Sequence, residues 1–329
     1  MRTRVIQFGV DKLKLCCTQD GDWLIQKIMD AYQSYDEQHS GLHATSRARQ
    51  LSIPLSDDVI LAVNVEKEFL DRYKLKGSVS LLYNGETTTF IDEIEIHAHK
   101  KGDNFKDSAF VTMSNRWLYI KGWASHLSRV MELLRLHYHN ITLMEVHCTS
   151  VNINFVDKIT KKRKEDGIIM VALDRAYRGK EKVLALGKWL RQTAIGSDLS
   201  YPTYYISTAK RDLAAKAYNK TIEMEEQSPE KIEYVREWLH GYKGTYHRLE
   251  VSLSKERTKT LLKKASYEKE QLRPLLESNN IVRELENNEL LQYLWKTSLN
   301  ALMHFKKGSK PQDWLRDVIH IDERHILTP

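Results

Sequence analysis

Tyrosines and basic residues crowd one segment in the second half of the chain. The stretch TYYISTAKRDLAAKAYNKTIE, residues 203–223, holds three tyrosines, four basic residues and several small side chains. A tyrosine hydroxyl can attack a phosphodiester, but a phenol has a pKa of about 10 and needs a nearby cation or base to react at neutral pH. The composition is therefore compatible with nucleophilic chemistry on a nucleic acid, although tyrosines on strands are more often packing residues.

The positive charge of the chain is concentrated around this segment. The chain holds 51 Lys and Arg against 44 Asp and Glu, a formal net charge of +7. Residues 156–220 alone contain fifteen basic and seven acidic residues. A concentrated basic field favours a polyanion such as DNA, and a solvated lysine-rich face is the alternative.

Alternating and helical spacings predict the elements that would hold these residues. We predict a strand at VDKLKLCC, a helix over 22–35, and two strands around the Asn84-Gly85 turn. FVTMSNRWLYIKG predicts a second strand pair around Ser114-Asn115, and a helix is expected from Trp123 to about His139.

The second half begins with a predicted central strand, ITLMEVHCTSVNINF. It is expected to turn through KITKKRKEDG into IIMVAL, which would put a basic cluster at a hairpin tip: Lys161, Lys162, Arg163 and Lys164. Such a tip could hold a phosphate backbone without reading sequence, or could merely keep the strands soluble. Lys210 and Arg211 are further candidate DNA-binding residues.

The last part of the chain has helical spacing to its end. Strands are expected at YPTYYIST and GTYHRLEVSLSK, and the pattern turns helical beyond Lys255. We therefore predict an α+β fold with a central, mostly antiparallel sheet over residues 1–255. A helical region over 256–329 would follow, serving DNA recognition or dimerisation.

The order of motifs between residues 110 and 260 resembles the replication initiation factor family. That family comprises initiators of staphylococcal-type rolling-circle plasmids and relaxases of some conjugative elements. Its Tyr, small turn and Tyr-Asp-Lys look like Tyr205, Ser207-Thr208-Ala209 and Tyr218-Asn219-Lys220, at the same thirteen-residue spacing but without the turn glycine.

Two further motifs of the family have counterparts on either side. A Trp-containing helix and an acidic strand look like residues 123–139 and LMEVHCT, where Glu145 takes the first acidic place and Thr149 stands in the second. The family's Arg-Leu-Glu strand looks like Arg248-Leu249-Glu250.

The resemblance implies that a tyrosine attacks a scissile phosphate and leaves a 5′-phosphotyrosyl link with a free 3′-hydroxyl. Tyr205 would be the nucleophile, with Tyr204 and Tyr218 as alternatives. Lys210, Arg211, Lys220 and Arg248 could supply positive charge. Glu145 and Glu250 would hold a divalent metal, Mg²⁺ or Mn²⁺, which suits carboxylate oxygens.

A rival metal site comes from another class of rolling-circle nickases, which use a His-hydrophobe-His strand. Ile96-His97-Ala98-His99 offers that pattern, and a polar edge strand is the alternative interpretation. Metal binding there would make Tyr218 with Lys220 the nucleophile pair. The sequence contains no GxxxxGK[ST], no strand-borne GxGxxG, no HExxH and no GxSxG motif, so ATPase, dinucleotide-dependent and zincin functions lose support.

The remaining expectations concern setting and partners. Cys16, Cys17 and Cys148 form no CxxC pair, and no segment approaches eighteen apolar residues, so a cytoplasmic protein without a membrane anchor is expected. Single-stranded or hairpin DNA is the expected partner, with a homodimer and a host helicase as further candidates. The alternative function is a noncatalytic nucleic-acid-binding protein whose tyrosines stack on bases.

Overall fold

A computed structural model of the chain divides it into two compact units, each described by itself. Unit 1 comprises residues 1–11, 145–273 and 285–329, and unit 2 comprises residues 12–144 and 274–284. The described residues are 5–19, 23–38, 49–65, 74–83, 85–101, 104–152, 165, 168–173, 181–183, 187–192, 198–205, 212–268, 282, 285–286, 288–307 and 310–312. Along parts of several strands only the backbone is described.

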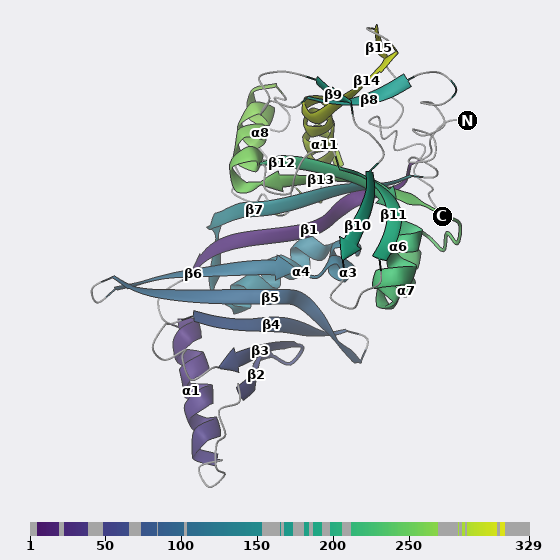
Figure 1. The fold of residues 1–329 in the computed structure, drawn as a ribbon. Helices are drawn as coiled ribbons and strands as arrows, with labels where there is room; N and C mark the ends of the chain where they lie inside the picture. Colours follow the sequence, from purple (N-terminus) through teal and green to yellow (C-terminus); the bar gives the residue numbers. More distant parts are fainter. Residues whose placement is uncertain are drawn as a thin grey trace. The chain divides into compact units, whose positions relative to one another are not determined.

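Unit 2 is built on an antiparallel sheet with the strand order β1, β6, β5, β4, β3, β2 (Figure 1). Its strands are β1 (Val5–Gln19), β2 (Arg49–Ser56), β3 (Val59–Val65), β4 (Lys74–Tyr83), β5 (Glu86–Lys101) and β6 (Asn104–Met113). Residues 5–11 of β1 belong to unit 1 and residues 12–19 to unit 2. The predicted hairpin is confirmed, because Tyr83 pairs with Glu86 and Gly85 has the positive φ of 82° that a tight turn requires. At His97, β5 is paired with both β4 and β6, so the edge-strand interpretation of this residue is wrong. His99 pairs with Lys106 of β6, and the described pairing with β4 ends at His97.

The helices of unit 2 agree with the sequence in part. Helix α1 (Trp23–Gln38) confirms the predicted helix. The second strand predicted after Ser114 is wrong, because helix α3 (Asn115–Leu118) follows there. Trp117 and Leu118 are both buried, whereas neighbouring residues of a strand would face opposite sides. The Trp117 ring packs edge-on against Phe90, with centroids 5.1 Å apart.

Helix α4 (Trp123–Leu133) ends six residues before the predicted limit at His139. Arg135 adopts a left-handed φ of 52°, through which a right-handed helix does not continue. Strand β7 (Leu136–Asn152) then begins, so His137 and His139 lie in a strand. Residues 136–144 of this strand belong to unit 2 and residues 145–152 to unit 1.

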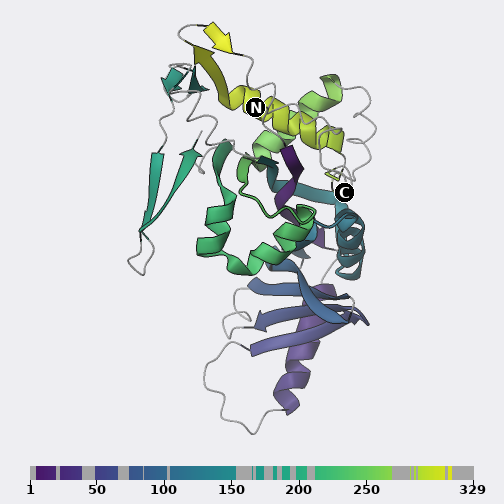
Figure 2. The ribbon, with the colours of Figure 1, turned by 90° about the vertical axis from the view of Figure 1, so that its right-hand side faces the viewer.

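Unit 1 carries the segment of tyrosines and basic residues on a second set of antiparallel strands. The order is β10 (Gly187–Gln192), β11 (Asp198–Tyr205), β12 (Leu213–Asn219), β13 (His247–Ser254) and β7. β11 pairs with β12 only over residues 203–205, and the rest of the β10–β11 ribbon diverges from β12 (Figure 2). The predicted strands around YPTYYIST, ITLMEVHCTSVNINF and GTYHRLEVSLSK are thereby confirmed.

Among the described residues, unit 1 also contains three short helical elements and two longer helices. They are α6 (Lys220–Gln227), η2 (Pro229–Lys231), α7 (Ile232–Trp238), α8 (Lys255–Glu268) and α11 (Asn288–Leu302). α11 contacts both β12 and β13. The C-terminal helices therefore belong with these strands, and the division differs from the predicted boundary after residue 255.

A separate four-stranded sheet in unit 1 corrects two predictions. Its order is β15 (Lys310–Gln312), β14 (Met303–Lys307), β8 (Ile168–Leu173) and β9 (Glu181–Val183). β8 pairs with β14 and β9, so the predicted hairpin between β7 and IIMVAL is wrong. β14 and β15 also show that the chain is not helical to its end. The basic cluster at 161–164 lies outside the described residues.

The α+β prediction is confirmed by these two units. None of the described helices is long and apolar enough to span a membrane.

Candidate active site

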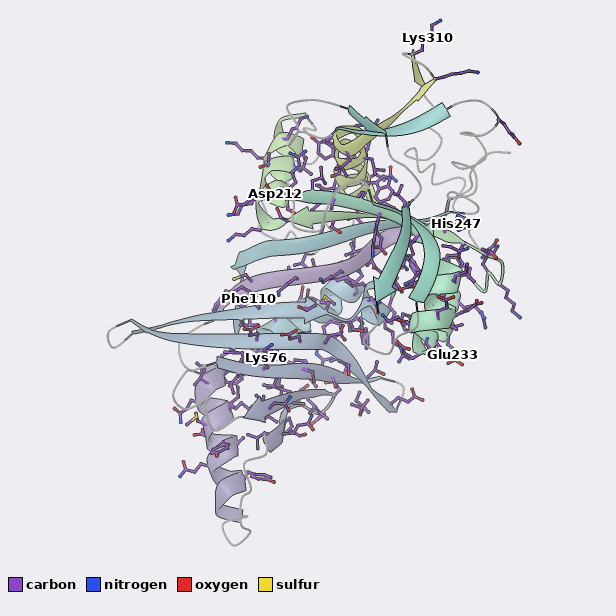
Figure 3. The ribbon with its side chains drawn as sticks, in the orientation of Figure 1. Lys76, Phe110, Asp212, Glu233, His247 and Lys310 are labelled. Atoms are coloured by element: carbon purple, nitrogen blue, oxygen red, sulfur yellow. The ribbon has the colours of Figure 1, made fainter. Side chains whose placement is uncertain are left out.

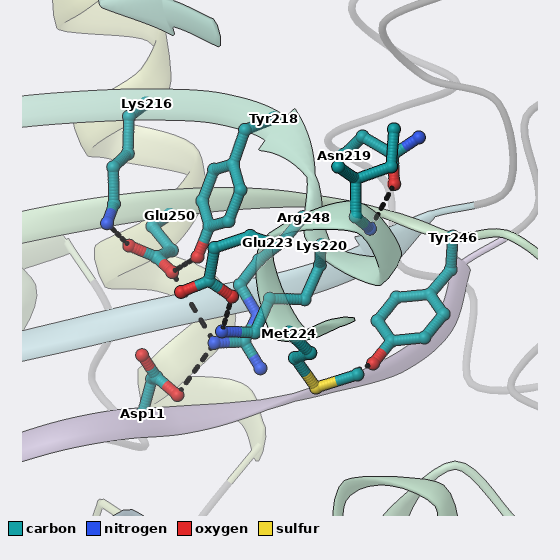
Figure 4. Close-up of polar contacts among 11 residues, drawn as sticks. Asp11, Lys216, Tyr218, Asn219, Lys220, Glu223, Met224, Tyr246, Arg248 and Glu250 are labelled. Atoms are coloured by element: carbon teal, nitrogen blue, oxygen red, sulfur yellow. Dashed lines mark hydrogen bonds and ion pairs between the residues drawn. The ribbon is translucent and has the colours of Figure 1, made fainter. Parts of the chain in front are cut away.

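Two neighbouring strands of unit 1 place four polar side chains on one face. Lys216 of β12 lies opposite Glu250 of β13, and Tyr218 lies opposite Arg248. Residues two apart on a strand share a face, and directly opposite residues of antiparallel strands are neighbours. The intervening Leu249 of β13 is fully buried among apolar residues. Arg248 and Glu250 therefore join the polar cluster shown in Figure 4, while the alternate residues Leu249 and Val251 are buried apolar side chains.

Glu250 is the centre of this cluster. Its side chain is 2% exposed. Oε1 accepts a hydrogen bond from the Tyr218 hydroxyl and lies 3.4 Å from Nη1 of Arg248, while Oε2 lies 2.8 Å from Nζ of Lys216. Burial alone would raise the pKa of this carboxyl, but the charges of Lys216 and Arg248 outweigh it and lower the pKa. Glu250 is therefore held as a carboxylate.

Arg248 links the cluster to the beginning of the chain. Its Nη1 lies 2.9 Å from Oδ1 of Asp11, a residue of β1 that is 237 positions away in sequence. The guanidinium contacts both Asp11 and Glu250 through this nitrogen (Figure 4). A buried cation of this kind is stable only when carboxylates neutralise it, so Asp11 and Glu250 fix the place of the positive charge.

Lys220 begins helix α6 at the edge of the cluster. The Asn219 side chain accepts a hydrogen bond from the backbone nitrogen of Ile222 at 3.2 Å and so caps the helix. Nζ of Lys220 pairs with Glu223 three residues later, and the side chain is 6% exposed. Burial, with the nearby Arg248 charge adding to it, lowers the pKa of Lys220 from 10.5 to about 8.

The cluster is balanced in charge but uneven in exposure. It contains three cations and three carboxylates: Lys216, Lys220 and Arg248 with Asp11, Glu223 and Glu250. Asp11 and Glu223 are 14% and 17% exposed, whereas Lys216 is 39% exposed. Lys216 is thus the cation of this cluster that solvent or a substrate reaches most easily.

Tyr218 has the environment of a fixed hydrogen-bond donor. It is 4% exposed, and Nζ of Lys216 and Nζ of Lys220 lie 4.9 and 5.8 Å from its ring centroid. Burial, followed by the charge of Glu250, raises the pKa of its phenol well above 10. A nucleophilic tyrosine needs the opposite shift, so the geometry favours Tyr218 as the group that orients Glu250.

The backbone register brings Tyr205 to the same strands. Tyr205 of β11 lies opposite Lys216, and Tyr204 lies opposite Ala217. Only the backbone of these two tyrosines is described, and Lys210 and Arg211 lie outside the described residues. The backbone thus places five of the predicted site residues on three consecutive strands or at the end of one: Tyr205, Tyr218, Lys220, Arg248 and Glu250.

The predicted pairing of Glu145 with Glu250 around one metal is not supported by the register. Glu145 lies opposite Ser254, and Glu250 lies opposite Thr149. Four residues along a strand span about 13 Å, too far for two carboxylates to share an ion. Among the described residues, no group of three or more His, Cys, Asp or Glu is placed to hold a metal ion. The side chains of Glu145, His97 and His99 are outside the described set.

Two members of the cluster were missed by the sequence analysis. Asp11 is a single acidic residue in an N-terminal strand, and nothing in its neighbourhood singles it out. Lys216 carries a detectable signal, because it stands two residues before Tyr218 and therefore on the same face of a strand.

Comparisons with known proteins leave the family open. No protein-family model matches the chain, and no curated protein matches its sequence. A solved structure of a rolling circle replication initiator protein from Geobacillus stearothermophilus is similar with 11% identity, 94% coverage of each chain and a TM-score of 0.38. DynU16, described as a putative protein in the dynemicin biosynthetic locus, is similar with 10% identity, coverage of 88% of this chain and 99% of the other, and a TM-score of 0.21. Similarities with TM-scores this low assign no function to the chain.

Proposed function

We propose that this protein nicks one strand of DNA through Tyr205 and initiates rolling-circle replication of a plasmid or mobile element. The observation that carries the proposal is the register of Tyr205 opposite Lys216, beside a cluster that fixes two further cations. Attack on the scissile phosphate would leave a 5′-phosphotyrosyl link and a 3′-hydroxyl that a polymerase can extend.

The cluster supplies what phosphoryl transfer demands of a protein. Negative charge grows on the nonbridging oxygens as the nucleophile approaches, and preorganised cations stabilise it without rearrangement. Arg248 is held by Asp11 and Glu250, and Lys220 by Glu223, so both charges are in place before DNA binds. The proposed activity thus combines the Tyr205 nucleophile with positive charges that the network holds in place.

The family resemblance implies that the proposed reaction needs a divalent metal ion. Glu145 and Glu250 do not fit a shared ion, so no step is assigned to a metal here. We expect Mg²⁺ or Mn²⁺ to be needed, and the ligands would have to include groups other than this pair.

A covalent trapping assay tests the proposal. The protein is incubated with a labelled hairpin oligonucleotide and Mn²⁺, in parallel with an EDTA arm, and the products are separated on a denaturing gel. We expect a protein–DNA adduct that the Tyr205→Phe variant does not form and that the Tyr204→Phe and Tyr218→Phe variants still form. Binding without any adduct would contradict the nickase and support the noncatalytic nucleic-acid-binding alternative.

A further inference from the structure

We propose that Lys216 is a catalytic residue that contacts the scissile phosphate and stabilises the phenolate of Tyr205. This inference rests on the proposed function and assigns a role to a residue outside the resemblance. Lys216 lies at the middle of three strands, opposite Tyr205 of β11 on one side and opposite Glu250 of β13 on the other.

The geometry distinguishes Lys216 from the other two cations of the cluster. Directly opposite residues of antiparallel strands have Cβ atoms about 5 Å apart, so a lysine side chain reaches a group carried by its neighbour. The Lys216 side chain is 39% exposed, compared with 6% for Lys220 and 2% for Arg248. A phosphate that approaches from solvent therefore meets Lys216 first.

The contacts of Lys216 keep its ammonium group charged and fix its position. Nζ lies 2.8 Å from Oε2 of Glu250 and 4.9 Å from the ring centroid of Tyr218 (Figure 4). Burial and, to a smaller degree, the charge of Arg248 would lower the pKa of this ammonium. The charge of Glu250, with a smaller contribution from Asp11, outweighs them, so the pKa is raised. Lys216 is thus a cation throughout the neutral range and serves as an electrostatic group, not as a base.

The step that Lys216 assists is a transesterification. The Tyr205 Oη–phosphorus bond forms as the bond between phosphorus and the 3′-oxygen breaks. The phenolic proton passes to water, and the leaving 3′-oxygen takes a proton from water. Lys216 stabilises the phenolate before attack and the added negative charge on the phosphate during it.

The test is the pH dependence of single-turnover adduct formation on a labelled single-stranded or hairpin oligonucleotide. In the wild type the rate rises with pH to a bend that marks ionisation of the nucleophile. In Lys216→Gln we expect the bend to move up by about one pH unit and the rate at pH 7 to fall about 100-fold. Lys216→Arg keeps the charge and should restore the position of the bend.

The matched control is Lys76→Gln. Lys76 lies on β4 of unit 2 and, like Lys216, pairs with a glutamate of the neighbouring strand, at 3.2 Å from Glu93 (Figure 3). The Lys76→Gln variant should leave both the rate of adduct formation and the bend of the pH–rate profile unchanged. Thermal unfolding checks that the variants are folded, and Lys216→Met replaces Lys216→Gln if the latter is not.

The outcomes separate the inference from the function beneath it. If Lys216→Gln forms the adduct at the wild-type rate and with an unshifted bend, the proposed role of Lys216 is wrong. The proposed nickase function is not affected by that result. A slower reaction with an unshifted bend, equally slow in Lys216→Arg, also overturns the role of Lys216, because a structural role would act in that way. Failure of the wild type to form any adduct overturns the proposed function and this inference together.

Discussion

Glu250 shows what a single residue requires when its charge is taken out of water. Tyr218, Lys216 and Arg248 all donate to or neutralise this one carboxylate, and its side chain is 2% exposed. An ionised carboxylate without such partners would be protonated in a buried environment. Lys216 and Arg248 therefore keep Glu250 ionised, and Glu250 in turn neutralises their charges.

Replacing Glu250 by Ala should be strongly destabilising. The change leaves Arg248 and Lys216 without their shared carboxylate, and removing one partner of a buried ion pair typically costs about 3–5 kcal/mol. The free energy of unfolding from urea titration measures the loss. Glu93→Ala is the control, because the Glu93 side chain is 47% exposed, and a loss for Glu250→Ala no larger than for this control would contradict the buried network.

Lys220 gives the cluster a pH signature. Its folded-state pKa of about 8 lies below the usual 10.5, so the unfolded chain binds more protons between these values and stability rises with pH across that window. The free energy of unfolding of the wild type, relative to Lys220→Met, should increase by roughly 2 kcal/mol from pH 7 to pH 10. A difference that stays flat with pH would show that Lys220 is not buried as described.

Sequence reasoning reached the residues that belong to ordered motifs and missed those that do not. Tyr205, Tyr218, Lys220 and Glu250 follow from motif order and spacing. Asp11 joins the site through a contact across 237 positions, which no local pattern encodes. The register does not support Glu145 and Glu250 as a metal pair for a related reason, because strand pairing decides which residues of β7 and β13 lie opposite each other.

At the scale of elements, the transition from β12 to α6 places Lys220. Asn219 ends the strand and caps the helix, with its side chain bonded to the nitrogen of Ile222. Asn219→Ala should cost about 1 kcal/mol of unfolding free energy, whereas Asn219→Asp keeps the cap and interacts favourably with the helix dipole. Denaturant titration of both variants is the measurement, and equal stability of Asn219→Ala and the wild type would argue against a stabilising cap.

Elements with strong local patterns were predicted well, and elements defined by distant partners were not. The Asn84-Gly85 hairpin and helices α1 and α11 follow from turn chemistry and periodicity. β14 pairs with β8 across more than a hundred residues, and its five residues carry too little pattern to be recognised alone. α3 stands where the sequence predicted a strand, and the high β-propensity of its Trp117 is overridden by packing against Phe90.

For the whole molecule, the proposed function requires an attraction to DNA that the charge-balanced cluster does not supply. The net charge of +7 and the basic surplus in residues 156–220 are the available source. Replacing Lys161, Lys162, Arg163 and Lys164 together by Gln should reduce the slope of log affinity against log salt by up to about four. Fluorescence anisotropy with a labelled oligonucleotide at about 50 to 200 mM salt would measure the slope. An unchanged slope would exclude this basic cluster from the DNA interface.

The cross-strand arrangement of the cluster also constrains how this protein can evolve in length. Successive side chains of a strand point to opposite faces of the sheet, so the residue pairs across β12 and β13 depend on their register. Inserting or deleting one codon within either strand would turn the following side chains to the opposite face. Lys216 and Tyr218 would then lie on the apolar face of β12, and Ala217 would lie on the face of the cluster. Descendants of this gene should therefore accumulate single-codon insertions and deletions elsewhere, and tolerate them in these two strands only at the expense of the site.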